Sequence, residues 1–251
     1  MSAQKYRCAW IGLGEDVQTS AMVPPPARPA RLILLGAPGI GKGTQAERLG
    51  AALGACQLST GDIFRAAKAF KGKLTPALEA ATGYMVRGEL VPDETVVDLV
   101  RERKASLACP YGFLLDGFPR TVPQAEALDG ILREVNVRLD AVLSYVLPIE
   151  KVIERISGRR TCRNCKAVYH VVAMPPKREG ICDKCGGELF LRDDDRPETI
   201  RVRMAAYDAA TRPLTEFYRA RNMLLEISAD GDADAVFART IRALRDTCGL
   251  G

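Results

Sequence analysis

The sequence predicts an α/β fold: a phosphate-loop, three-layer architecture in which a five-stranded parallel sheet is flanked by helices on both faces. Short apolar runs alternate with segments of helical periodicity, which is the pattern of parallel strands joined by helices. A glycine-rich stretch with a lysine follows the first run, as expected where such a strand leads into a phosphate-binding helix. The five expected strands cover Leu32–Leu35, Cys56–Leu58, Phe113–Leu115, Ala141–Leu147 and Leu224–Ile227.

The composition is that of an ordinary globular protein. Of the 251 residues, 47% are hydrophobic and 27% are charged, so the chain can bury a core. The net charge of +5 favours an anionic partner, and a phosphorylated small molecule satisfies it as well as a nucleic acid does. No stretch approaches the roughly 20 apolar residues that cross a bilayer. Four of the eight cysteines form two CxxC pairs and the others are scattered, which favours a reducing compartment, the cytoplasm.

Residues 1–30 form a segment of their own. The sequence PPPARP near its end is typical of a stiff linker, and nothing before it has a core-forming pattern. A signal peptide needs a longer apolar stretch, and Glu15 with Asp16 is atypical of a transit peptide. We therefore expect a disordered N-terminal extension, with Met22 as an alternative start, followed by one domain over residues 31–251.

The first strand and the helix after it enclose the sequence GAPGIGKGT, residues 36–44. Its glycines allow backbone amides to converge on phosphate oxygens, Lys42 adds a positive charge, and the helix presents its positive end. This spacing after a strand strongly favours a phosphate loop over a plain glycine-rich turn. One position departs from the general pattern, because Gly43 stands where Ser or Thr is usual and Thr44 follows one place late.

The third strand ends at a carboxylate. The apolar run GFLLDG leads to Asp116, an arrangement in which an aspartate at a strand end helps to hold Mg²⁺ through its water shell. The next residue is Gly117, where many phosphate-loop hydrolases place a glutamate that activates water. The sequence therefore favours transfer to a bound acceptor over hydrolysis.

Two CxxC pairs, TCRNC and CDKC, predict a metal site. Two turns that each present two sulfurs can enclose one tetrahedral ion, so Cys162, Cys165, Cys182 and Cys185 are expected to bind zinc, with iron as the alternative. A zinc module that grips nucleic acid would carry a basic face with exposed aromatic residues. Residues 158–195 hold eight basic residues against six acidic ones, which leaves a phosphate-loop ATPase with a nucleic-acid module as the weaker alternative. A catalytically dead metal-binding scaffold is disfavoured by the intact Lys42 and Asp116.

Five motifs together resemble the nucleoside monophosphate kinases: GAPGIGKGTQ, STGDIFR, GFLLDGFPRT, GRR and RDDDRPETIRVR. The resemblance runs from about Leu32 to the C-terminus, and it is strongest to the adenylate kinase family of the long-lid type with a zinc-binding lid. It implies reversible, Mg²⁺-dependent transfer of the terminal phosphoryl group of ATP to AMP, which gives two ADP. It also implies a helical AMP-binding insertion at residues 59–91, a lid over ATP at residues 158–195, a structural zinc ion, and a monomer without nucleic-acid or membrane partners.

The resemblance also implies the site residues by motif position. The residues expected around the transferred phosphoryl group are Lys42, Asp116, Arg120, Arg159, Arg192 and Arg203. ATP is expected to contact Gly39, Ile40, Gly41, Lys42, Gly43, Thr44, Arg155, Arg159, Val168, Tyr169 and Ala233. AMP is expected to contact Thr60, Arg65, Glu89, Leu90, Val91, Gly117, Phe118, Pro119, Arg120, Gln124, Arg192 and Arg203.

Some of these residues also have simpler explanations. A glutamine amide can pair with the donor and acceptor edge of adenine, but Gln124 taken alone fits an exposed polar position on a helix. Arg203 taken alone fits a salt-bridged amphipathic helix. Residues 193–195, three consecutive aspartates, are expected to cap a helix and pair with lid arginines rather than to bind metal. His170 is not needed beside four thiolates, so we expect it to pack within the lid.

Overall fold

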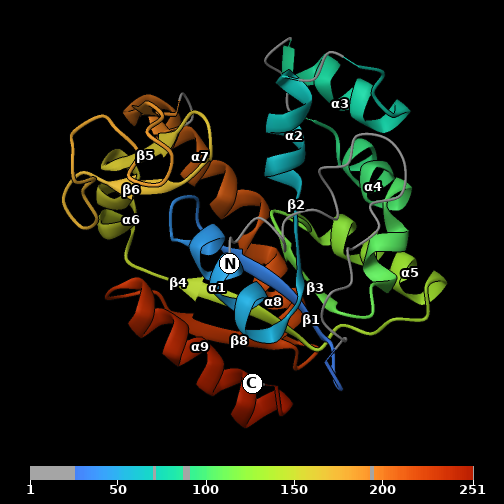
Figure 1. Cartoon of the computed structure of the whole chain (residues 1–251). Helices are drawn as coiled ribbons and strands as arrows, with labels where there is room; N and C mark the ends of the chain where they lie inside the picture. Colours follow the sequence, from blue (N-terminus) through green and yellow to red (C-terminus); the bar gives the residue numbers. More distant parts are fainter. Residues whose placement is uncertain (1–25, 70–71, 87–90, 193–194, 251) are drawn as a thin grey trace.

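The computed structural model describes residues 26–69, 72–86, 91–192 and 195–250 (Figure 1). Residues 1–25, which include Met22 and most of the expected N-terminal extension, lie outside this range. So do Glu89 and Leu90, two of the expected AMP contacts. For Arg65 the structure describes the backbone, which lies in a helix, and not the side chain.

Five parallel strands form the central sheet, as the sequence predicts. Their spatial order is β2-β3-β1-β4-β8, so β1 lies in the middle with β3 and β4 as its neighbours. In such a sheet, the loops that follow the central strands meet at the carboxyl edge, where α/β proteins bind their ligands. The strands are β1 (Ala30–Gly36), β2 (Cys56–Ser59), β3 (Gly112–Asp116), β4 (Ala141–Val146) and β8 (Leu224–Ser228).

Helices cover both faces of this sheet. The helices are α1 (Lys42–Leu53), α2 (Thr60–Ala69), α3 (Pro76–Val86), α4 (Asp93–Glu102), α5 (Val122–Glu134), α6 (Ile149–Ser157), α7 (Pro197–Ala210), α8 (Arg212–Arg219) and α9 (Ala233–Cys248), with a 3₁₀ turn η2 (Lys104–Ala108). Within the described ranges, none of these helices has the length and apolar character required to cross a bilayer. Helices α2 and α3 occupy the part of the chain in which the sequence predicts a helical insertion.

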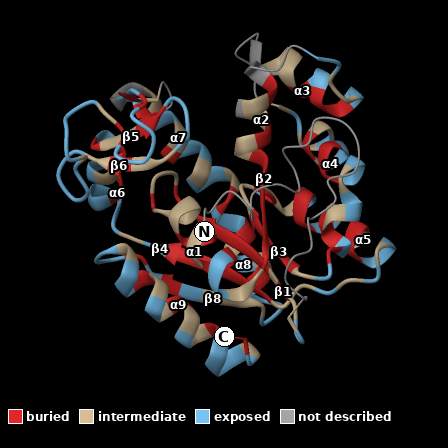
Figure 2. Cartoon of the chain, in the orientation of Figure 1, coloured by how far each residue is buried: buried red, intermediate tan, exposed pale blue. Residues whose placement is uncertain are grey.

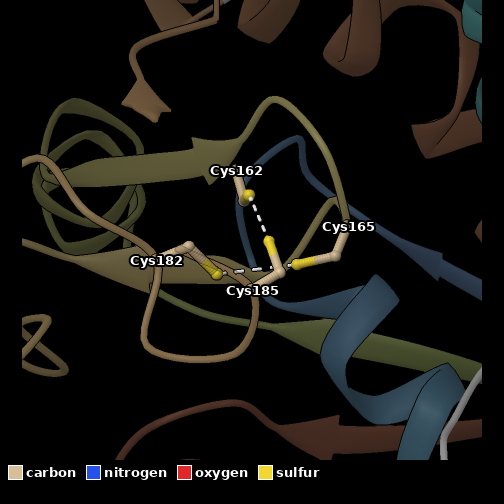
Figure 3. Close-up of side chains that lie close together, drawn as sticks. All are labelled: Cys162, Cys165, Cys182 and Cys185. Carbon is tan, nitrogen blue, oxygen red and sulfur yellow. Dashed lines mark hydrogen bonds between the residues drawn. The ribbon is translucent and has the colours of Figure 1, made fainter. Parts of the chain in front are cut away.

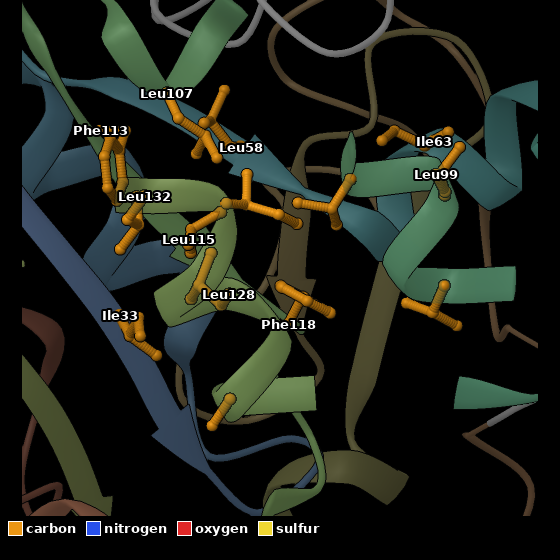
Figure 4. Packing of buried hydrophobic residues seen from close by; sticks show 14 of the residues in the cluster. Ile33, Leu58, Ile63, Leu99, Leu107, Phe113, Leu115, Phe118, Leu128 and Leu132 are labelled. Carbon is orange, nitrogen blue, oxygen red and sulfur yellow. The ribbon is translucent and has the colours of Figure 1, made fainter. Parts of the chain in front are cut away.

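Alternate residues of each strand face opposite layers, which explains why the apolar runs are continuous. Ile33 of β1 packs in a cluster with Phe113 of β3 and Leu128 of α5, whereas the adjacent Leu34 packs with Leu49 of α1 on the other face. Figure 4 shows the first of these clusters, and Figure 2 shows the buried strands between their two layers of helices. Burial of each large apolar side chain contributes about 1.5–3 kcal/mol to stability, so both faces help to hold the sheet.

A second sheet lies apart from the first. Three short antiparallel strands in the order β6-β5-β7 form it, and Figure 1 shows it beside α6 and α7. We call it the cysteine-bearing sheet. The sequence indicates only turns and cysteines here, because strands of two to four residues are too short to show a period. The strands are β5 (Arg159–Cys162), β6 (Val168–His170) and β7 (Leu189–Phe190).

Candidate active site

The loop between β1 and α1 has the backbone shape of a phosphate cradle. Gly39 and Gly41 have φ values of 77° and 105°, a region that glycine adopts without strain. At Gly39 a Cβ atom would also lie 1.9 Å from Cγ1 of Ile156 in α6, so no larger residue fits without movement. Helix α1 begins at Lys42, and no side chain caps it at Gly41. The first N–H groups of the helix therefore remain suited to an anion.

The ammonium group of Lys42 lies against this loop. Its Nζ donates to the carbonyl oxygens of Gly36, at 2.6 Å, and Ala37, at 3.0 Å. The pKa of Lys42 is lowered from 10.5 to about 8, mainly because the surrounding protein removes water from the charged group. Asp116 opposes this effect on the pKa.

Three arginines from separate segments add their charge at the same place. Arg120, Arg203 and Arg159 each lower the pKa of Lys42 electrostatically. They come from the loop after β3, from α7 and from β5. The structure therefore places Asp116 and three of the expected arginines close enough to Lys42, at the carboxyl edge of the sheet, to act on its charge.

Asp195 holds two of these arginines in place. The carboxylate is fully buried, and it accepts hydrogen bonds from both Nε (2.7 Å) and Nη2 of Arg159. Arg203 approaches the same carboxylate at 3.3 Å. Pairing with an arginine was expected here and is confirmed for Asp195, whereas residues 193 and 194 lie outside the described residues. A buried carboxylate between two guanidinium groups fixes their direction.

Arg192 has a different position from the other expected arginines. Its Nε donates to Oγ1 of Thr161 in β5 at 2.8 Å, which places it on the cysteine-bearing sheet. A role for Arg192 at the transferred group remains a prediction.

The loop after β3 joins Thr60, Gly117 and Arg120. The carbonyl oxygen of Gly117 accepts from Oγ1 of Thr60 at 3.0 Å and from Nε of Arg120 at 2.9 Å. Gly117 has a φ of 86°, and a Cβ atom there would lie 2.8 Å from Oγ1 of Thr60. The following Phe118 is buried, and its peptide bond to Pro119 is cis. The expected AMP contacts in this region thus lie side by side.

Gln124 is buried in α5, with 3% of its surface exposed, which excludes the simpler alternative of an exposed polar position on a helix. Its Oε1 accepts from the backbone N–H of Arg120 at 2.8 Å, and its Nε2 donates to Oδ1 of Asp93 at 2.7 Å. Asp93 is not among the residues that the sequence motifs indicate. The only local signal is an acidic residue in the first turn of a helix, which fits an ordinary interaction with the helix dipole.

Arg155 links the phosphate loop to the segment that precedes α9. Its guanidinium donates to the carbonyl oxygens of Ile40 (3.4 Å) and Gly231 (2.9 Å). Two residues beyond Gly231, the carbonyl oxygen of Ala233 accepts from Nε2 of Gln45 at 3.0 Å. Arg155 therefore lies against the loop and Ala233 against the first turn of α1, which is compatible with the expected contacts to the ATP base.

The four cysteines of the two CxxC pairs meet at one point (Figure 3). Their sulfur atoms all lie within 4.8 Å of one another. Four thiolates at Zn–S distances of about 2.3 Å place their sulfurs about 3.8 Å apart, so the cluster has the size of a tetrahedral site. Cys162 and Cys182 are buried, and Cys165 and Cys185 are exposed. The donor set is therefore compatible with a structural metal ion.

Residues around the cysteines fill the small core of this sheet. The hydroxyl group of Tyr169 contacts Sγ of Cys182 and accepts from the backbone N–H of Asp183 at 2.8 Å, so the ring lies against the thiolate cluster. Because the Tyr169 hydroxyl is engaged here, ATP would have to contact the backbone of Tyr169 or a side chain that has moved. The expected ATP contacts of Val168 and Tyr169 stay predictions. His170 accepts backbone hydrogen bonds at Nδ1, which confirms the expectation that it packs within this segment.

Comparison with known proteins identifies relatives over most of the chain. A sequence profile described as adenylate kinase matches residues 34–223. The adenylate kinase of Archaeoglobus fulgidus is 51% identical over 206 residues, which are 82% of this chain and 94% of the relative. The adenylate kinases of Carboxydothermus hydrogenoformans and Salinispora tropica are 49% and 51% identical over 86% and 87% of this chain, and over 99% and 100% of their own lengths.

Proposed function

The chain belongs to the adenylate kinase family, and we propose that it transfers the terminal phosphoryl group of ATP to AMP, reversibly and with Mg²⁺, to give two ADP. The observation that carries this proposal is the convergence of Lys42, Asp116, Arg120, Arg159 and Arg203 at the carboxyl edge of a parallel sheet. In the reaction, an oxygen of the AMP phosphate forms a bond to the γ-phosphorus of ATP, and the bond from that phosphorus to the β,γ-bridging oxygen breaks.

The cations act on charge that spreads over the phosphoryl oxygens during transfer. Lys42 stands on the phosphate loop and is suited to the β- and γ-phosphates, while Arg120, Arg159 and Arg203 surround the same point. Arg192 joins this set when the cysteine-bearing sheet closes over the nucleotide. Mg²⁺ supplies charge neutralisation across the phosphates, and Asp116 at the end of β3 is the residue that would hold its water shell.

The donor and the acceptor nucleotides have separate contacts. For ATP, the loop and helix start at Gly39, Ile40, Gly41, Gly43 and Thr44 hold the phosphates, and Arg155, Val168, Tyr169 and Ala233 border the base. For AMP, the group formed by Thr60, Gly117, Phe118, Pro119 and Arg120 borders the phosphate, with Arg65 on α2. Gln124 reads adenine, together with Glu89, Leu90 and Val91. In both cases the support is the motif position, combined with the contacts of the residues that the structure describes.

The cysteine-bearing sheet serves as a lid that excludes water from the transfer. Water must be excluded because ATP would otherwise be hydrolysed. The sheet has few buried apolar residues, and we assign the thiolate cluster to one structural zinc ion that supplies the missing stability. The chain acts as a monomer in the cytoplasm; the family supports this proposal, and the seven described cysteines, none of which forms a disulfide, support the reducing compartment.

One assay tests the proposed function directly. The purified chain is incubated with Mg²⁺, ATP and each of AMP, GMP, CMP and UMP, and formation of the diphosphates is followed. AMP is expected to be the fastest acceptor, and ADP alone should be converted to ATP and AMP. Equal or faster turnover with another monophosphate would contradict the choice of AMP. Release of inorganic phosphate without an acceptor would support the ATPase alternative instead.

The lowered pKa of Lys42 predicts how activity depends on pH. Above about pH 8 the nucleotide-free protein loses the charge of Lys42, so kcat/KM for MgATP is expected to fall as the pH rises through this value. The turnover number kcat should hold to higher pH, because bound triphosphate raises the pKa of Lys42 again. The measurement is a pair of pH profiles, at low and at saturating MgATP.

Loss of folding does not explain such a fall. Between pH 8 and 10.5 the folded chain binds fewer protons at Lys42 than the unfolded chain does, so this group makes the free energy of unfolding larger as the pH rises. The Lys42→Met variant is the control, and its residual kcat/KM should lack the inflection. A profile of kcat/KM that stays flat to pH 10 would refute the assignment of this pKa to Lys42.

A further inference from the structure

We propose that Asp93 is a positioning residue that fixes the orientation of the Gln124 side-chain amide and so makes the acceptor site selective for adenine over 6-oxopurines. The inference rests on the proposed function, in which Gln124 reads the acceptor base. It assigns a role to a residue outside the family motifs. The carboxylate lies at the start of α4, 31 residues before Gln124 in the sequence.

Both ends of the Gln124 amide are held, and by groups of opposite kind. The carboxylate of Asp93 can only accept, and it lies 2.7 Å from one end of the amide. The backbone N–H of Arg120 can only donate, and it lies 2.8 Å from the other end. Only one orientation satisfies both partners: Nε2 toward Asp93 and Oε1 toward Arg120. After a 180° rotation of the amide, its N–H group would face the N–H of Arg120 and its oxygen would face the carboxylate of Asp93, so both hydrogen bonds would be lost.

A third contact fixes the orientation of the Asp93 carboxylate. Oγ1 of Thr121 donates to Oδ2 of Asp93 at 2.5 Å, while Oδ1 accepts from Gln124. The same Thr121 oxygen caps α5 by accepting from the backbone N–H of Gln124. Each carboxylate oxygen therefore has its own partner, and the network ties the start of α4 to the start of α5.

The fixed amide presents a fixed order of donor and acceptor to a base. The two contacts use one of its two N–H donors and one of its two acceptor lone pairs, which leaves one of each for a ligand. Adenine carries an N–H donor at position 6 beside a ring nitrogen that accepts, so it matches Oε1 and Nε2 in this order. Hypoxanthine and guanine carry an acceptor oxygen at position 6, which meets Oε1 and is repelled. An amide that is free to rotate could bind either base.

The test replaces Asp93 by Asn and measures acceptor selectivity. The asparagine side chain keeps the shape of aspartate but can donate as well as accept, so it no longer dictates the orientation of Gln124. We expect the ratio of kcat/KM for AMP to kcat/KM for IMP to fall about tenfold, the size of one bidentate base contact. The KM for MgATP should stay unchanged. IMP is the probe because it differs from AMP at position 6 and in the protonation of the neighbouring nitrogen.

Two controls separate positioning from a general effect on α4. Asp98→Asn removes the same charge from an exposed position on the same helix and should leave the AMP/IMP ratio unchanged. In a Gln124→Ala background, Asp93→Asn should have no further effect on the ratio, because the residue through which it acts is absent. Should Asp93→Asn fail to fold, Asp93→Ser replaces it, since serine is tolerated in a first helical turn and its hydroxyl also donates and accepts.

The outcomes are distinct from those of the functional assay. A folded Asp93 variant that keeps the wild-type AMP/IMP ratio would overturn the inference, as would an equal loss in the Gln124→Ala background. A parallel rise in the KM for MgATP would show that Asp93 only stabilises the fold, which also overturns it. If the wild-type chain phosphorylates no AMP at all, it is the proposed function that fails.

Discussion

Replacement of Lys42 by Met is expected to lower kcat by about three orders of magnitude or more, the range found when a preorganised cation or donor at a transferring group is removed. The ammonium group lies on the phosphate loop, where Asp116 and three arginines act on its charge. Methionine keeps much of the length and the apolar stem of lysine, so the loop should fold. The measurement is the rate of ADP formation under saturating MgATP and AMP.

Lys104→Met is the matched control. This lysine is exposed on η2 and pairs with Glu134 at 2.8 Å on the surface, so its loss should leave kcat within about twofold, as usual for a surface ion pair. Arg120→Met should resemble Lys42→Met in its loss of kcat, since its guanidinium acts at the same point. Near-wild-type turnover in either active-site variant would show that the transferred group lies elsewhere.

The second large effect concerns the thiolate cluster. Cys182→Ser is expected to lower the Tm by about 5 °C or more, because a structural zinc ion contributes its binding energy to folding and each kcal/mol is worth roughly 2–4 °C in a chain of this size. Activity at low temperature should be largely kept, since four thiolates saturate the ion and leave no position for substrate. Metal analysis of the wild-type chain should give one zinc ion per molecule.

Cys248→Ser serves as the comparison, because this half-buried cysteine of α9 lies outside the cluster. Its Tm should stay within about 1 °C of the wild type, as for most substitutions away from packed features. A metal-free protein that is fully folded but inactive at low temperature would contradict a structural role for the ion. If metal analysis finds iron instead of zinc, the identity of the metal changes, but its structural role in the thiolate cluster does not.

The central sheet could be predicted because each strand carries its own signal. Leu34 and Ile33 point to opposite layers, and burial on both sides makes the run continuous in the sequence itself. The three strands of the cysteine-bearing sheet have no such signal. They are held by pairing across turns and by sulfur atoms that come together only in three dimensions.

Some residues of the candidate site could also be predicted from the local sequence, and others could not. Asp116 ends β3, and Lys42 begins the helix that follows β1 after a short loop, so their place at the carboxyl edge is a consequence of local order in the sequence. The burial of Gln124 is not local, because it depends on a partner in α4 and on the backbone of Arg120. Nor could the sequence show that one carboxylate, Asp195, would serve two arginines from different elements.

The contact between Gly39 and Ile156 has a consequence for how sequences of this kind can diverge. The two residues are 117 positions apart, yet a single added carbon at position 39 would collide with the side chain at position 156. Position 39 also has a backbone conformation that other residues rarely adopt, so it has two independent reasons to remain glycine. Ile156 is itself fully buried and packs with Val152 and Ile200, so a change in its size affects this cluster as well as the loop. Helix α6 is followed after one residue by β5. A substitution at position 156 is therefore expected to affect both the phosphate loop and the position of the cysteine-bearing sheet.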